Sequence, residues 1–189
     1  MRWDDYSSFF LAATGKRPFP YQEKFAQAST LPKLMNVPTG TGKTATMVLG
    51  WVWRRFYYPD KNIHQNTPRR LIYSLPMRVL VGQTRTSTIN MLDCLAKHDE
   101  RLRDVKVVVL MGGESDTDWM QTPEEEQIII GTQDMLLSAA LNRGYAMSRF
   151  RWPYAFGLLN NDCLWCFDEV QLMGSGLATS VQLDAFRKI

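Results

Sequence analysis

Residues 38–44, Pro-Thr-Gly-Thr-Gly-Lys-Thr, are the feature that most constrains how this chain of 189 residues can fold. They separate a short, mainly apolar run at 33–37 from a long apolar run at 45–56 that contains no proline. The first run predicts a buried strand and the second a covered helix. A glycine-rich turn between a strand and a helix can point backbone N–H groups at a phosphate, and the helix start adds the positive end of its dipole. The stretch therefore predicts a phosphate-binding loop.

The residue types in this loop suit a nucleotide with its metal ion, ATP and Mg²⁺. Lys43 can bring a positive charge to the outer phosphates, where it also serves catalysis, and the Thr44 hydroxyl can ligate Mg²⁺. The strict form of the pattern has glycine at the position of Val37, so the loop departs from it there. The predicted nucleotide-binding residues of the loop are Thr39, Gly40, Thr41, Gly42, Lys43 and Thr44.

Length and composition predict one domain that spans residues 1–189, with 1–17 as an N-terminal extension. A chain of this length with 45% hydrophobic residues can bury a sizeable core. The net charge of +3 permits a polyanionic partner but does not require one. No apolar run reaches membrane-spanning length, and the first residues lack the apolar core of a signal peptide. We therefore expect a cytoplasmic protein without a membrane partner.

Further along the chain, apolar runs alternate with helical patterns. Strands are expected at 71–75, 105–111, 127–132 and 162–167, and helices at 78–97, 133–143 and 177–188. Residues 58–70 are expected to be a loop, and the aromatic stretch 144–161 is assigned no element. The alternation predicts an α/β fold, a RecA-like open parallel sheet with helices on both faces.

Two adjacent carboxylates, Asp168 and Glu169, follow the last predicted strand. In an open parallel sheet the carboxyl ends of the strands form the ligand-binding edge. Asp168 can hold the Mg²⁺ shell, and Glu169 can act as the catalytic base that deprotonates the attacking water. The pair therefore predicts the second half of a nucleotide-hydrolysing site.

Gln22 lies in the stretch Phe19-Pro20-Tyr21-Gln22, about twenty residues ahead of the phosphate loop. This stretch resembles the helicase Q motif, in which a glutamine amide reads the adenine edge with one donor and one acceptor. Gln22 is accordingly a predicted nucleotide-binding residue, and an ordinary surface glutamine is the alternative.

Taken together, the motifs resemble the first motor domain of a superfamily-two helicase. The order is the phosphate loop, Leu-Pro-Met-Arg at 75–78, Gly-Gly at 112–113, Gly-Thr-Gln at 131–133 and Asp-Glu-Val-Gln at 168–171. The segment 168–187 is more specific, being similar to the CRISPR-associated helicase–nuclease of type I systems and most like the type I-G (formerly I-U) branch.

The resemblance implies a function: the ATP-binding domain of an ATP-dependent translocase on single-stranded DNA in antiviral defence, recruited by a guide-RNA surveillance complex. It implies contacts to the DNA backbone from Arg78, Gly112, Gly113 and Thr132. Many relatives carry histidine in place of Gln171, which would couple hydrolysis to strand movement. The second motor domain and the histidine-aspartate nuclease domain are absent from the 189 residues, whose two histidines cannot supply a multi-histidine metal site. Both domains are expected as partners.

Two other functions share the nucleotide motifs. One is a stand-alone nucleotide-binding module without motor activity, and the other is the motor domain of an RNA helicase or a restriction enzyme. The sequence gives neither the polarity of movement nor the choice between DNA and RNA.

Overall fold

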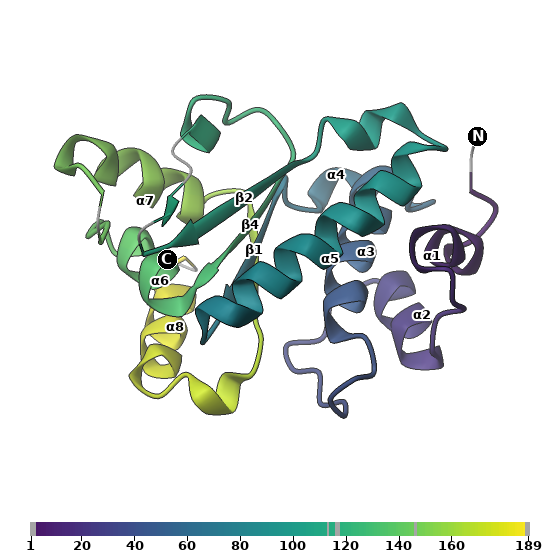
Figure 1. Cartoon of the computed structure of the whole chain (residues 1–189), viewed down its shortest axis with the longest axis horizontal. Helices are drawn as coiled ribbons and strands as arrows, with labels where there is room; N and C mark the ends of the chain where they lie inside the picture. Colours follow the sequence, from purple (N-terminus) through teal and green to yellow (C-terminus); the bar gives the residue numbers. More distant parts are fainter. Residues whose placement is uncertain (1–2, 113, 116–117, 146, 188–189) are drawn as a thin grey trace. The chain divides into compact units, whose positions relative to one another are not determined.

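The computed structural model describes residues 3–112, 114–115, 118–145 and 147–187. Four helices come first in the chain, and strands and helices are interspersed from residue 70 onward, as Figure 1 shows. The chain divides into two compact units, residues 1–68 with 86–104 and residues 69–85 with 105–189. The long helix α5 (Arg78–Ala96) contributes to both.

The first unit is helical. It contains α1 (Tyr6–Thr14), α2 (Pro20–Gln27), α3 (Lys43–Phe56), α4 (Lys61–Asn66), the second part of α5 and the 3-10 turn η1 (Glu100–Arg103). Aromatic rings fill its core: the ring centroids of Phe9 and Trp53 lie 5.4 Å apart, and those of Tyr6 and Trp53 lie 5.6 Å apart. Packed aromatic pairs of this kind contribute beyond their buried area.

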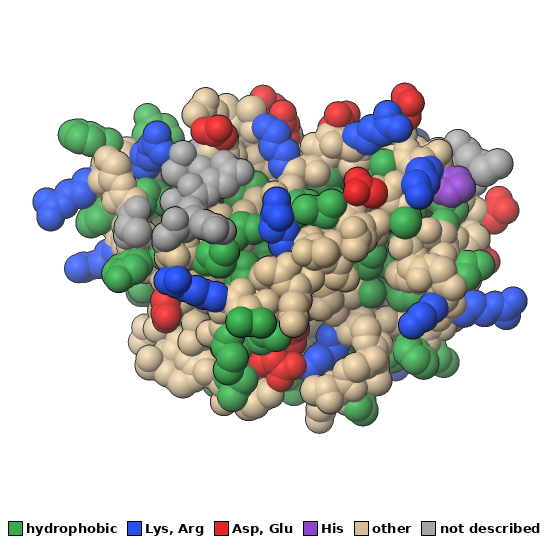
Figure 2. All heavy atoms as spheres, viewed as in Figure 1, with side chains coloured by type: hydrophobic (Ala, Val, Ile, Leu, Met, Phe, Trp, Pro, Cys, Tyr) green, Lys and Arg blue, Asp and Glu red, His purple; other side chains and the backbone are tan. Residues whose placement is uncertain are grey.

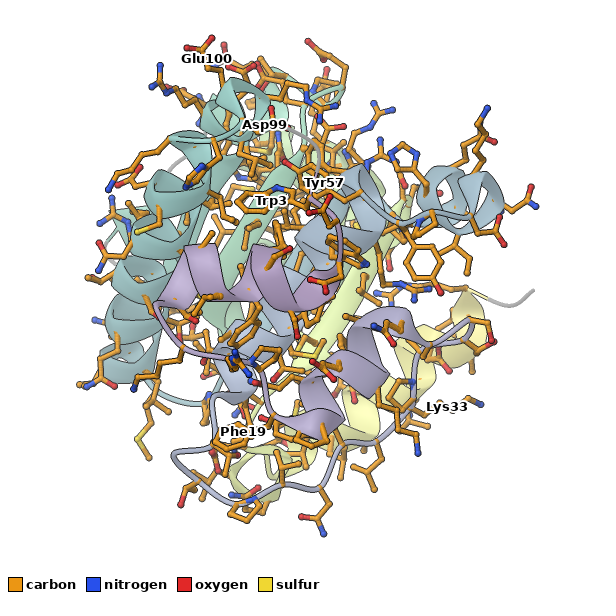
Figure 3. The ribbon with its side chains drawn as sticks, turned by 90° about the vertical axis from the view of Figure 1, so that its right-hand side faces the viewer. Trp3, Phe19, Lys33, Tyr57, Asp99 and Glu100 are labelled. Carbon is orange, nitrogen blue, oxygen red and sulfur yellow. The ribbon has the colours of Figure 1, made fainter. Side chains whose placement is uncertain are left out.

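A polar cluster closes one end of this core. Asp99 accepts a hydrogen bond of 2.8 Å from the Tyr57 hydroxyl and one of 2.6 Å from the Arg101 guanidinium. Figure 3 shows Tyr57 and Asp99 lying together beside Trp3. The hydrogen bonds from Arg101 are the main reason why the pKa of Asp99 lies below its ordinary value. Asp99 therefore stays ionised and holds η1 against the end of α3.

The second unit is built on a five-stranded sheet in the order β3-β2-β4-β1-β5. The strands are β1 (Arg70–Leu75), β2 (Lys106–Met111), β3 (Glu114–Ser115), β4 (Gln127–Thr132) and β5 (Cys163–Phe167). All neighbours pair in parallel except β3, which is antiparallel to β2. The central strands β1 and β4 are buried along their whole length, which explains their nearly continuous apolar sequence.

Three helices of the second unit pack on this sheet: α6 (Gln133–Ala140), α7 (Trp152–Asn160) and α8 (Ser175–Phe186). Short 3-10 turns connect the elements: η2 (Asp118–Met120), η3 (Arg149–Arg151) and η4 (Val170–Leu172). Buried Arg70 ties α7 to the sheet, since its guanidinium donates to the carbonyls of Leu158, Asn161 and Pro123 at 2.8–3.1 Å. These bonds give a buried charge the partners that it needs.

Two expectations from the sequence were wrong, and one stretch that was left without an element contains two. Residues 33–37 form no strand, and Leu34 is 74% exposed, so the apolar run is not buried in a sheet. The expected loop at 58–70 contains α4, whose first turn Asp60 caps by accepting a hydrogen bond from Asn62 N–H. The unassigned stretch 144–161 contains η3 and α7, with Ala155 and Leu159 fully buried.

The other expected strands and helices are confirmed to within about three residues at each end. Among the described residues, none of the helices combines the length and the apolar character needed to span a bilayer.

Candidate functional site

The predicted phosphate loop has the backbone of an anion-binding turn. Gly40 and Gly42 have φ angles of 78° and 84°, in the left-handed region that glycine enters without strain, and α3 begins at the next residue, Lys43. A Cβ added to Gly42 would lie 3.1 Å from the Gln22 amide nitrogen, so the site has little room for a side chain. Lys43 and Thr44 occupy the first turn of α3, where the positive end of the helix dipole favours a bound anion.

Two side chains of α2, Tyr21 and Gln22, hold this loop through hydrogen bonds, and we call these contacts the brace. The Gln22 amide nitrogen donates to the Gly42 carbonyl at 3.2 Å and to the Thr46 hydroxyl at 3.0 Å. The Tyr21 hydroxyl donates to the Thr41 carbonyl at 2.7 Å. The carbonyls on either side of the Gly42 nitrogen are therefore held by two neighbouring residues of one helix.

Gln22 is only 2% exposed, and its amide oxygen accepts a hydrogen bond of 2.8 Å from Phe19 N–H. In this structure the amide nitrogen and the amide oxygen of Gln22 are therefore both used in hydrogen bonds within the protein. Adenine reading by Gln22 stays a prediction, whereas its bond to the loop is an observed role. The supporting residues Tyr21 and Thr46 were missed in the sequence, where the available signal was a polar Thr46 inside an apolar helix.

The other loop residues lie within the turn. The Thr41 hydroxyl donates to the Pro38 carbonyl at 2.6 Å, which closes the turn on itself. Thr39 and Gly40 are exposed, and Lys43 and Thr44 are half-buried at the helix start. The residues predicted to bind the phosphates are thus contiguous and at the surface.

In the second unit, the predicted nucleic-acid contacts follow the carboxyl ends of parallel strands. Arg78 follows β1, Gly112 follows β2, and Thr132 ends β4 beside Leu75 of β1. The Arg78 guanidinium lies against Gly112, where an added Cβ would be 2.6 Å from the guanidinium nitrogen. The structure therefore brings Arg78 and Gly112 together. Gly113 lies outside the described residues.

The acidic pair follows β5 at the same edge. Asp168 accepts hydrogen bonds at one carboxylate oxygen from the Tyr73 hydroxyl, 2.9 Å away, and at the other from Glu169 N–H, also 2.9 Å away. Its own N–H donates to the Ser74 carbonyl at 3.0 Å. Tyr73 is fully buried in β1, and no local pattern in the sequence indicates that its hydroxyl reaches Asp168. These bonds fix Asp168 at the edge of the sheet.

Glu169 has a strained backbone. Its φ and ψ of 52° and 47° lie in the left-handed region, which residues other than glycine seldom occupy. Holding a residue there costs about 1–3 kcal/mol, and such strain is concentrated at functional sites. Its carboxylate accepts a hydrogen bond of 2.5 Å from the Gln171 amide. The contact between the predicted base and the predicted coupling residue is therefore present.

The donor set fits a magnesium ion that is carried by a nucleotide. Mg²⁺ is bound through one or two protein oxygens with phosphates and water, so it needs no cage of protein ligands. Asp168 offers carboxylate oxygens, and hydrogen bonds from the Tyr73 hydroxyl and Glu169 N–H fix their position. Among the described residues, no three His, Cys, Asp or Glu side chains form a group that could hold a metal ion. A surface pocket of about 690 Å³ in the first unit, lined by residues 56–59 and 98–101 among others, contains none of the predicted site residues.

Comparison with known proteins places the chain in a helicase family. Residues 20–186 match the family described as DEAD/DEAH box helicase. That family has the RecA-like P-loop fold, so the match and the parallel sheet together confirm the predicted fold class. No curated protein matches the chain.

Proposed function

The chain belongs to the DEAD/DEAH box helicase family, and on this premise we propose that it is the ATP-binding domain of a motor that moves along single-stranded DNA. Family membership supports a nucleotide-binding helicase motor with ATPase activity. The observation that carries the proposal is the phosphate loop: two glycines with positive φ directly before a helix that begins with Lys-Thr.

Lys43 and the N-terminal N–H groups of α3 would bind the outer phosphates of ATP. The brace from Tyr21 and Gln22 holds the carbonyls of Thr41 and Gly42, so the loop would not have to reorganise when the phosphates arrive. A preformed loop of this kind keeps the ordering cost of binding low.

Thr44 and Asp168 would hold Mg²⁺, which neutralises phosphate charge when it is bound with ATP. Glu169 would accept the proton of the attacking water. The Gln171 amide, which donates to the Glu169 carboxylate at 2.5 Å, would orient that base. A change at the γ-phosphate would reach Gln171 through Glu169, which gives the coupling role a physical route.

Arg78, Gly112 and Thr132 would contact the nucleic-acid backbone. The exposed Arg78 offers positive charge, and backbone N–H groups and hydroxyls donate to phosphate without reading the base. Such contacts suit a motor that must move over any sequence.

DNA as the track, and recruitment by a guide-RNA surveillance complex in CRISPR antiviral defence, are proposed on the resemblance of residues 168–187 to the type I helicase–nucleases. An RNA helicase motor remains compatible with the family. Under the proposal, the second motor domain and the nuclease are supplied by other polypeptide segments or subunits.

The test measures coupling between the two ligands on the 189-residue chain. Fluorescence anisotropy gives the affinity for labelled single-stranded DNA and RNA of equal length, each with and without Mg-ATP. We expect tighter binding of DNA, and an affinity that changes with Mg-ATP, because coupling between two binding sites is reciprocal. Stronger binding of RNA would overturn the DNA assignment, and an unchanged affinity would favour the nucleotide-binding module without motor activity.

Recruitment is tested separately with a purified type I surveillance complex. The chain should bind the complex after the complex has opened its target DNA, and failure to do so would refute the CRISPR role while leaving the motor assignment intact.

A further inference from the structure

Aromatic and basic side chains gather between the end of α6 and the first turn of α7. We name this the α6–α7 surface and define it by Tyr145, Arg149, Phe150, Arg151 and Tyr154. The side chain of Phe150 is 89% exposed, that of Tyr145 68% and that of Tyr154 66%, and both arginines are exposed. Figure 2 shows hydrophobic and basic side chains side by side over the region that α7 occupies in Figure 1. Large exposed aromatics on a soluble surface mark interaction sites.

The charged residues in and around this surface, between Asp134 and Asp162, are all arginines. Residues 135–161 contain three arginines, at 143, 149 and 151, and no aspartate or glutamate. The elements packed against α7 include α6 and η2, which carry Asp134 and Asp118. The charge of +3 on residues 135–161 equals the net charge of the whole chain, so the positive and negative charges on the other residues cancel. This surface therefore attracts a polyanion.

Hydrogen bonds and close packing hold the chain next to the exposed aromatic residues. The Trp152 indole N–H donates to the Met147 carbonyl at 3.0 Å, and an added Cβ at Gly144 would lie only 2.8 Å from the Trp152 ring. The Asn160 amide donates to the Ala140 carbonyl at 2.9 Å and so joins the last turns of α7 and α6. These contacts tie the backbone next to the exposed aromatics to α6 and α7.

The burial of one face of α7 explains why Tyr154 faces outward. Ala155 and Leu159, one helical turn apart on α7, are fully buried against the sheet, which leaves Tyr154 on the outer side. The Arg149 guanidinium lies 5.9 Å from the centroid of the Trp152 ring, which limits its freedom as well.

We propose that the α6–α7 surface is an accessory binding site for single-stranded nucleic acid, in which Phe150 and Tyr154 stack on bases and Arg149 and Arg151 contact phosphates. Exposed aromatic faces interleaved with arginines are the combination that binds single strands without regard to sequence. An acidic peptide would satisfy the charge, but it would leave the aromatic faces without a planar partner.

The site is separate from the predicted motor contacts. Arg78, Gly112 and Thr132 lie where strands end, whereas the α6–α7 surface follows a helix. Its binding would not need ATP, so it would persist in a Lys43→Ala variant that has lost nucleotide binding. A failure of this inference is thus distinguishable from a failure of the proposed motor function.

The experiment compares an ordinary single-stranded oligonucleotide with an abasic one of equal length and charge, by anisotropy with the 189-residue chain and no nucleotide. Phe150→Ala should weaken binding of the ordinary strand about tenfold and leave the abasic strand unaffected, because only a base can stack. Phe186→Ala removes an aromatic side chain that is 70% exposed on α8 and should change neither affinity.

A second experiment tests the role of the arginines with two double variants that lower the net charge equally. Arg149→Ala with Arg151→Ala should weaken binding of both strands and reduce the salt-dependence slope by about 1.4, since each phosphate contact on a single strand contributes about 0.7. Lys16→Ala with Arg17→Ala, two exposed cations after α1, should leave the slope unchanged.

Three results would overturn the proposal. The first is equal behaviour of Phe150→Ala and Phe186→Ala on the ordinary strand. The second is equal behaviour of the two charge variants. The third is displacement of the oligonucleotide by polyglutamate as efficiently as by the unlabelled strand, which would assign the surface to an acidic protein partner. Unfolding midpoints of all variants, whose altered side chains are exposed, check that each one folds.

Discussion

Replacing Gln22 by alanine should loosen the phosphate loop and destabilise the chain. The substitution removes three hydrogen bonds: from Phe19 N–H to the amide oxygen, and from the amide nitrogen to the Gly42 carbonyl and the Thr46 hydroxyl. Each contributes about 0.5–1.5 kcal/mol, so the loss in unfolding free energy should be about 1.5–4.5 kcal/mol. The high burial of Gln22 favours the upper half of that range, because water cannot readily replace the lost partners.

The assay is urea unfolding of the Gln22→Ala variant beside Gln27→Ala. Gln27 is an exposed glutamine on the same helix, so its replacement should change the unfolding free energy by less than about 0.5 kcal/mol. Calorimetric titration then separates the two roles of Gln22. If it only braces the loop, ATP and GTP should lose affinity equally, whereas adenine reading predicts a loss confined to ATP.

An unfolding free energy that drops no more for Gln22→Ala than for Gln27→Ala would refute the brace. Unchanged affinity for both nucleotides would show that the loop keeps its shape without these hydrogen bonds.

Three further predictions concern the predicted site and the core. Lys43→Ala should weaken Mg-ATP binding about ten- to hundredfold, since charge-assisted hydrogen bonds of about 1.5–3 kcal/mol are lost; unchanged affinity by calorimetry would remove the phosphate-loop assignment. Glu169→Gln should keep Mg-ATP bound but slow hydrolysis by about 10²–10⁴ in the complete motor, and turnover at the parent rate would exclude Glu169 as the base. Burial raises the pKa of the Cys163 thiol to about 11, so its thiolate is scarce at neutral pH and becomes abundant only as the pH rises through that value. Iodoacetamide at pH 8 should therefore modify Cys163 far more slowly in the folded chain than in urea, and equal rates would contradict its burial.

The sequence by itself determined the elements whose pattern is local. The helix α3 and the strands β1, β2 and β4 follow from continuous apolar runs bounded by glycine or proline, and these signals need no knowledge of the partner strand. The phosphate loop could also be predicted from the sequence, because its glycines, lysine and threonine are contiguous and their chemistry depends on that spacing.

Tertiary structure decided what depends on partners distant in the chain. Residues 33–37 have the composition of a strand, yet a strand exists only where another backbone completes its hydrogen bonds, and composition cannot supply that partner. The brace joins Gln22 to groups 20 and 24 residues away, and Tyr73 reaches Asp168 across 95 residues. Such contacts follow from packing and not from spacing.

The left-handed backbone conformation of Glu169 was likewise decided by the tertiary structure. Its residue type gives no hint of a positive φ, because the conformation costs free energy locally and persists only when surrounding contacts impose it. The sequence thus predicted which residues would carry the chemistry. The fold decided how they are held, because hydrogen bonds and burial act between neighbours in space, wherever those neighbours lie in the chain.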